Sequence, residues 1–127
     1  MKATLPSKPT RHRKVARNSL KHRLWAIEAA RQAKQVLPFF ERERPDDNRP
    51  RQAIEAIAAW GRKKRELGMA AVRKLSLDSH AAARAARTDA ARFAARAAGQ
   101  AVATWHAPTH AIAVPYYFRK AVTASKI

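Results

Sequence analysis

Residues 45–60 read Pro45-Asp46-Asp47-Asn48-Arg49-Pro50-Arg51-Gln52-Ala53-Ile54-Glu55-Ala56-Ile57-Ala58-Ala59-Trp60. The side chains of Asp46, Asp47 and Asn48 can each accept hydrogen bonds from the free backbone N–H groups of a first helical turn. Pro50 is tolerated in that turn because its missing N–H is not needed there. Ile57 and Trp60 then fall on one apolar face. The stretch predicts an amphipathic helix with a charged entrance, which is either a capped helix with surface ion pairs or a polar site.

The rest of the chain is also dominated by residues that favour helix. Alanine is abundant, β-branched residues are few, and only 3 of the 127 residues are glycine, a composition typical of helical proteins. The length suggests one domain with one core. We therefore expect an all-α fold, a compact bundle of about five helices. Apolar periodicity and helix breakers place these helices at about residues 20–43, 48–66, 69–86, 90–105 and 108–123.

Several local features refine this bundle. Pro38 should kink the first helix or end it near Leu37, because proline removes one hydrogen bond of the helix. The charged segment Glu41–Arg44 reads as a solvated turn. Gly99 would let the two alanine-rich helices at 69–86 and 90–105 approach each other closely. The large apolar side chains expected in the core are Phe40, Ile57, Trp60 and Phe93.

Positive charge is concentrated at the N-terminus but also covers the body of the chain. The formal net charge is +18, and residues 1–23 hold eight Lys or Arg residues and no acid. We expect a basic flexible tail at 1–19 and a single helical domain at 20–127. Such a tail attracts phosphate, so non-specific nucleic-acid binding is one expected activity.

Other classes of protein are not supported. The chain has no cysteine, which excludes disulfides and thiolate metal sites and fits a cytoplasmic location. No apolar run approaches the ~20 residues of a membrane span, and the N-terminus lacks the apolar core of a secretory signal. We therefore expect no membrane partner.

Candidate catalytic and metal-binding patterns are weak. His106 and His110 have a spacing that suits a metal ion on a helix, but Pro108 lies between them. An acid–base pair of Asp46 or Asp47 with a histidine would depend on tertiary proximity. There is no nucleophile elbow and no phosphate-binding loop. We expect no enzyme activity, no cofactor and no metal.

Several blocks of sequence together resemble a known family. They read Val36-Leu37-Pro38-Phe39-Phe40-Glu41, Asp46 to Ala56, Trp60-Gly61, His80-Ala81-Ala82-Ala83-Arg84, Ala94 to Thr104, then His106 and His110-Ala111. In their order and spacing they are similar to a bacterial family of immunity-five-like helical proteins, over about residues 24–122. The resemblance implies an all-helical domain from a toxin–immunity locus, which binds and neutralises a cognate toxin.

The resemblance also implies a set of binding residues. The family's recurrent polar positions match Asp47, Arg49, Arg51, Glu55, His80, Arg84, Arg96, His106 and His110, to which the neighbouring Asp46 is added. Because the chain is so basic, an acidic toxin surface is the best match.

The polar positions lead to a geometric expectation and to two alternative functions. Since buried charges must be paired, we expect one connected network, with His80 or His106 lining its mouth; its members are Asp47, Arg49, Glu55, His80 and Arg84. The first alternative to the immunity function is a small basic protein associated with nucleic acid. The second is an enzyme or metal protein that uses the Asp, Arg and His residues.

Overall fold

The computed structural model describes residues 15–126, which form five α-helices and, within that range, no β-strand. The helices are α1 (Leu20–Glu43), α2 (Arg49–Gly61), α3 (Met69–Ala85), α4 (Asp89–Ala103) and α5 (His110–Ser125). The expected all-α bundle is confirmed, and most helix ends lie within two residues of the predicted ones.

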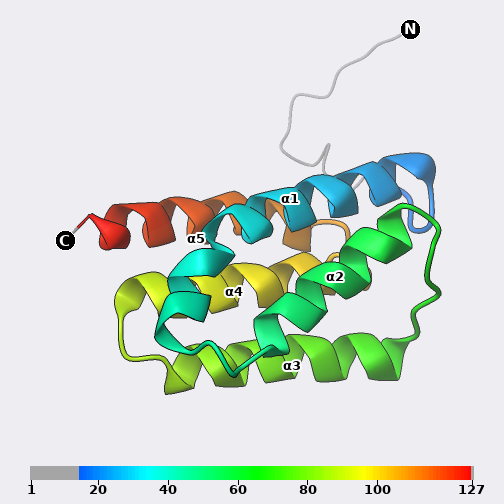
Figure 1. The fold of residues 1–127 in the computed structure, drawn as a ribbon. Coiled ribbons are helices and arrows are strands. Elements are labelled where there is room, and N and C mark those ends of the chain that lie inside the picture. The colour runs from blue at the N-terminus through cyan, green and yellow to red at the C-terminus, as the bar shows by residue number, and fades with distance from the viewer. Residues whose placement is uncertain (1–14, 127) are drawn as a thin grey trace, which may run out of the picture.

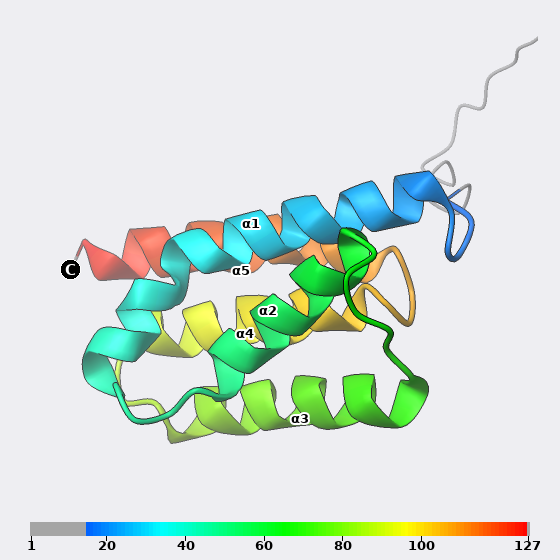
Figure 2. The same cartoon turned by 45° about the vertical axis from the view of Figure 1, so that its right-hand side comes forward.

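Helix α4 is the centre of the bundle, because it packs against each of the other four helices. Figures 1 and 2 show α1 and α5 lying side by side, α3 at the opposite edge of the bundle, and α2 crossing in front of α4. The buried positions of α4 are almost all alanine. Such small side chains let neighbouring helices come close from several directions, and the expected direct pairing of α3 with α4 is present.

Helix α1 continues through Pro38 to Glu43 and bends in its last part (Figure 1). A kink was one of the two outcomes expected for this proline. The helix does not end there because its apolar stripe continues: Leu37 and Phe40 are both buried in the core. Packing of this last turn offsets the hydrogen bond that the proline cannot make.

Helix α2 ends at Gly61 rather than near Glu66, so its predicted C-terminal end is wrong. Gly61 lies so close to α1 that an added Cβ would stand 2.6 Å from Cγ1 of Ile27. Lys63 then takes a left-handed conformation, with φ of 63°. The basic residues that follow Gly61 offer no apolar side chain for packing, so helix propensity alone does not extend the helix.

The predicted core is largely confirmed. Phe40, Ile57 and Trp60 have at most 2% of their surface exposed. Phe93 is only partly buried; it packs at the margin of the core, with its ring stacked on Tyr117 at 6.3 Å between centroids.

Most of the predicted tail, residues 1–14, lies outside the described residues. The next five residues contact the helices. Val15 is 7% exposed, and the Arg17 guanidinium lies 5.1 Å from the ring centroid of Trp105. Ser19 caps α1 by accepting a hydrogen bond from the backbone N–H of His22 at 3.1 Å. These contacts join the approach to α1 to the connection between α4 and α5.

Candidate functional site

The ten predicted site residues divide into two groups. Asp46, Asp47, Arg49, Arg51 and Glu55 belong to the α1–α2 connection and to α2, whereas His80, Arg84, Arg96, His106 and His110 belong to α3, α4, the α4–α5 connection and α5. Within residues 15–126 no hydrogen bond or ion pair joins a member of one group to a member of the other. The single connected network expected from the sequence is therefore wrong. Asp47 is bonded to Arg49, Glu55 is paired with Arg51, and His80 is bonded to Arg96, with no bond between these pairs in the described part of the chain.

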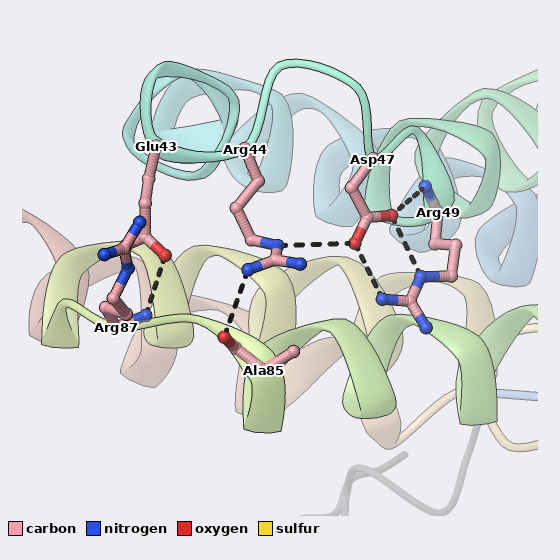
Figure 3. A network of polar contacts seen from close by, with 6 residues as sticks. All are labelled: Glu43, Arg44, Asp47, Arg49, Ala85 and Arg87. Carbon is pink, nitrogen blue, oxygen red and sulfur yellow. Dashed lines mark hydrogen bonds and ion pairs between the residues drawn. The ribbon is translucent and has the colours of Figure 1, made fainter.

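Asp47 is the centre of the first group, the acid–arginine group (Glu41, Glu43, Arg44, Asp47, Arg49, Arg51 and Glu55). Its carboxylate accepts two hydrogen bonds from the guanidinium of Arg49, at 2.7 and 2.9 Å, and one from the backbone N–H of Arg49 at 3.1 Å (Figure 3). Arg44 adds an ion pair at 3.8 Å. The hydrogen bonds from Arg49 hold the pKa of Asp47 below its ordinary value. Asp46, by contrast, is exposed.

Two residues that the sequence analysis assigned to a solvated turn tie this group to the α3–α4 connection. The carboxylate of Glu43 accepts hydrogen bonds from the backbone N–H groups of Arg87 at 2.7 Å and Thr88 at 3.0 Å. Arg44 donates to the carbonyl oxygen of Ala85 at 3.2 Å (Figure 3). Burial raises the pKa of Glu43, but these hydrogen bonds outweigh it and the net shift is downward. The solvated-turn prediction was wrong for both residues, since their partners lie more than forty positions away.

Arg51 forms the other half of the group. Its guanidinium makes two hydrogen bonds of 2.7 Å to Glu41 and lies 3.7 Å from the carboxylate of Glu55. The bond from Arg51 lowers the pKa of Glu41. Apart from the exposed Asp46, every acid at this end of the molecule has an arginine or backbone partner. The group carries four negative and three positive charges, each with a partner, and its contacts hold α1, α2 and the α3–α4 connection together.

The second group, the histidine–arginine cluster (His80, Arg84, Arg96, His106 and His110), is built differently. Nδ1 of His80 lies 2.9 Å from Nη1 of Arg96. Because a guanidinium can only donate, His80 accepts this bond and its ring is neutral. Burial, and then the charges of Arg96, Arg84 and His110, lower the pKa of His80 to about 4. His110 lies 2.9 Å from Oε1 of Gln100, and burial followed by the charge of His106 lowers the pKa of His110.

Gly99 makes room for His80, in agreement with the close approach of α3 and α4 expected at this glycine. An added Cβ at Gly99 would stand 2.6 Å from Nε2 and 2.7 Å from Cε1 of the His80 ring. The imidazole therefore lies directly on the backbone of α4. Ser76 reinforces the same junction by donating to the carbonyl oxygen of Gly99 at 3.2 Å.

The cluster contains no acid. Arg84 is exposed, and within residues 15–126 it forms no ion pair; the hydrogen-bond partner of Arg96 is the neutral His80. None of the charges that shift the pKa values of His80 and His110 comes from a carboxylate. Two guanidinium charges without an acidic partner among the described residues therefore lie near His80, as His110 does, where α4 packs against α3 on one side and against α5 on another.

The family comparison covers both groups. The model of the Imm-5 like putative immunity protein family matches residues 16–126. The chain belongs to this family. Searches of curated proteins and of solved structures gave no match. Membership implies a partner toxin, and the match includes residues 16–19, which were assigned to the tail from the sequence.

This Imm-5 like chain also has a buried histidine that the sequence analysis missed. His22 is fully buried, with Nε2 2.6 Å from the carbonyl oxygen of Thr104 and Nδ1 accepting from the backbone N–H of Asn18 at 2.9 Å. Its ring packs edge-on against Trp60. Burial lowers the pKa of His22, so the neutral ring joins α1, α2 and α4. A histidine in a basic stretch carries no sequence signal for such burial.

Metal and membrane features are not found in the described part of this family member. Among residues 15–126, no three His, Cys, Asp or Glu side chains gather in a way that could hold a metal ion. His106 is exposed in the α4–α5 connection, while His110 begins α5. None of the five helices is both long and apolar enough to cross a membrane.

A groove of about 240 Å³ lies between α1 and α2. Arg51, one of its lining residues, is paired with Glu41. Arg23 of α1 also contacts α2: it donates to the carbonyl oxygen of Trp60, and its guanidinium lies 4.3 Å from the centroid of that ring. The groove is lined by Ile27, Ala30, Arg31, Lys34, Leu37, Arg51, Ile54, Glu55, Ala58 and Arg62. The two predicted site residues Arg51 and Glu55 thus border an opening in the surface.

Proposed function

We propose that this Imm-5 like protein binds a cognate toxin and neutralises it by covering part of the toxin surface, without catalysis of its own. The observation that carries the proposal is the α1–α2 groove, which combines an apolar floor with unused positive charge on both walls. We place this encounter in the cytoplasm, consistent with a chain that has no cysteine.

The size of the groove fits a protein anchor better than a cofactor. At about 240 Å³ it is smaller than the ~300–1,000 Å³ typical of small-molecule sites. Its floor is formed by apolar side chains, among them Ala30, Leu37 and Ile54. In protein interfaces, one or two apolar side chains seated in such a pocket commonly carry most of the binding energy.

The walls of the groove fit acidic residues beside that anchor. Arg31 is paired with Glu28 at 2.6 Å, and Arg51 is paired with Glu41. Lys34 on the α1 wall and Arg62 at the end of α2 are both exposed and form no ion pair within residues 15–126. A toxin surface with an apolar side chain flanked by carboxylates would complete both sets of contacts.

Co-expression with a toxin tests the function, and a toxin gene found beside this gene is the first choice. We expect the wild-type chain to restore growth of cells that make the active toxin, and to bind an inactivated toxin in a purified mixture. Absence of both effects would contradict the proposed function.

Charge reversal tests the groove as the contact surface. The double variant Lys34→Glu with Arg62→Glu should raise the dissociation constant for the inactivated toxin by roughly tenfold or more. A matched control reverses Lys21 and Arg73, which are equally exposed and lie outside the groove. Equal weakening by both variants would mean that net charge, rather than the groove, attracts the toxin.

A nucleic-acid-binding function is the second candidate, and the loop after α2 favours it. Arg62, Lys63, Lys64 and Arg65 are all exposed there. Deleting residues 1–14, which hold five Lys or Arg residues, and replacing Lys63 and Lys64 with Gln should flatten the salt dependence of binding to random DNA. Each lost phosphate contact lowers the slope of log K against log salt by about 0.9. An unchanged slope would argue against this function.

The third hypothesis, an enzyme or metal protein, has no observation in its favour. The acids and histidines that it would combine lie in separate groups, and each of those acids except the exposed Asp46 is already paired with an arginine.

A further inference from the structure

We infer that the histidine–arginine cluster is an oxyanion-binding site, which takes a phosphate or carboxylate group between Arg84 and Arg96 while His80 positions the guanidinium of Arg96. This inference does not depend on the proposed toxin-binding groove, since the two regions share no residue.

The first argument is the missing counter-charge. Arg96 is half-buried, and of its five N–H groups one is directed to the neutral His80. Arginines of the acid–arginine group are satisfied quite differently: Arg49 and Arg51 each make two hydrogen bonds to one carboxylate. A positive charge withdrawn from water normally requires a paired anion. In the cluster, no side chain of the described residues supplies one.

The second argument is the convergence of donors. Arg84 lies one helical turn beyond His80 on α3, so both side chains are on the same face. Arg96 approaches from α4, and His110 approaches from α5 closely enough to lower the pKa of His80. The planar guanidinium matches a carboxylate or phosphate through two parallel hydrogen bonds, whereas a metal cation would be repelled by two arginines.

The third argument is rigidity. His80 is held between the backbone of Gly99 and the guanidinium of Arg96. Both helices are packed directly together, so Arg96 presents its remaining N–H groups in a fixed direction before any ligand arrives. Such preorganisation reduces the entropy lost on binding. His80 is therefore a positioning residue, not a contact for the anion.

The test uses the full chain and NMR signals of the histidine rings. The protein is titrated near pH 7 with inorganic phosphate and, separately, with sodium acetate, and sodium chloride keeps the ionic strength constant. We expect a saturable shift of the His80 signals with at least one of the two anions. The bound anion should also raise the pKa of His80 above about 4, because it compensates the arginine charges.

Variants at the two arginines separate a built site from general attraction to a basic protein. Arg84→Gln and Arg96→Gln should each weaken binding of the effective anion by at least about tenfold. Arg73→Gln is the matched control, because Arg73 is an exposed arginine of the same helix. Saturation with phosphate alone would identify the bound group as a phosphate. Saturation with acetate alone would identify it as a carboxylate. Linear shifts that are the same in all variants would overturn the site.

The role of His80 is tested by a conservative pair. Gln at this position can still accept from Arg96, whereas Phe fills the space and cannot. With the His110 signals as the readout, we expect His80→Gln to retain most of the anion affinity and His80→Phe to lose at least about fivefold. If both variants bind like the wild type, or lose affinity equally at matched melting temperatures, His80 does not position Arg96.

Discussion

The acid–arginine group and the histidine–arginine cluster both contain arginines, but only the first contains carboxylates that balance the arginine charge. In the first, the carboxylates of Glu41, Glu43 and Asp47 are bound by arginines or backbone N–H groups. In the second, Arg96 is bonded to the neutral His80, and Arg84 is near enough to lower the pKa of that ring, with no acid among them. Completed ion pairs are expected to stabilise the fold, whereas unmatched charges are available to a ligand. Mutations should therefore lower stability in one region and binding in the other.

The largest effect is expected in the core that both regions share. Trp60 is 2% exposed and contacts His22 and Arg23. Trp60→Ala should lower the free energy of unfolding by about 3–5 kcal/mol, measured by urea denaturation. This loss sets the scale for the other variants. An unchanged urea midpoint would show that the packing around Trp60 contributes little.

Gly99→Ala should have the next largest effect. The added methyl group overlaps the His80 ring at 2.6 Å, and overpacking of this kind costs about 1–3 kcal/mol. Higher helix propensity of alanine offsets up to about 1 kcal/mol of that loss. The double variant Gly99→Ala with His80→Ala should recover stability relative to Gly99→Ala, because the overlapping ring is gone. Additive losses in a double-mutant cycle would contradict the close contact.

A direct comparison of the two regions uses Asp47→Ala and Arg84→Ala. Asp47 is mostly buried and accepts three hydrogen bonds from Arg49, so its loss should cost about 1–2 kcal/mol. Arg84 is exposed and unpaired within the described residues, so its replacement should change stability by less than about 0.5 kcal/mol. Urea denaturation measures both. Equal losses would remove the distinction between the regions.

The last test changes only pH. In the folded chain the pKa values of His22 and His80 are lowered, that of His80 to about 4. Because the ordinary pKa of histidine is 6.5, the unfolded chain binds more protons than the folded chain below pH 6.5. Stability from these histidines is complete above pH 6.5 and declines as pH falls toward about 4. The lowered pKa values of Glu41 and Asp47 predict a further decline at lower pH.

Urea midpoints measured against pH should show both declines. In the variant His80→Gln, the decline in stability between pH 6.5 and about 4 should be smaller, because only His22 still contributes to it. A midpoint that stays constant between pH 6.5 and 4 would contradict the neutral state of both rings.

Local sequence signals predicted the helices because those signals act within a few residues. Thr88 caps α4 by accepting a hydrogen bond from the backbone N–H of Ala91, three residues along the chain. Apolar spacing identified Ile57 and Trp60 as core residues of α2. The end of α2 was predicted less well, because Gly61 stops the helix against Ile27 of another helix. Helix propensity depends on the residues of α2 alone, so it gives no information about that contact with α1.

The sequence by itself thus determined an all-α chain, its main core and the list of polar residues from which both regions are built. Only the tertiary structure decided which of those residues meet. Glu43 forms hydrogen bonds with Arg87 and Thr88, and His22 forms one with Thr104. Arg96 forms its hydrogen bond with His80 instead of an acid. Hydrogen bonds and ion pairs act over a few ångströms, and partners tens of positions apart are brought within that range only when the helices pack.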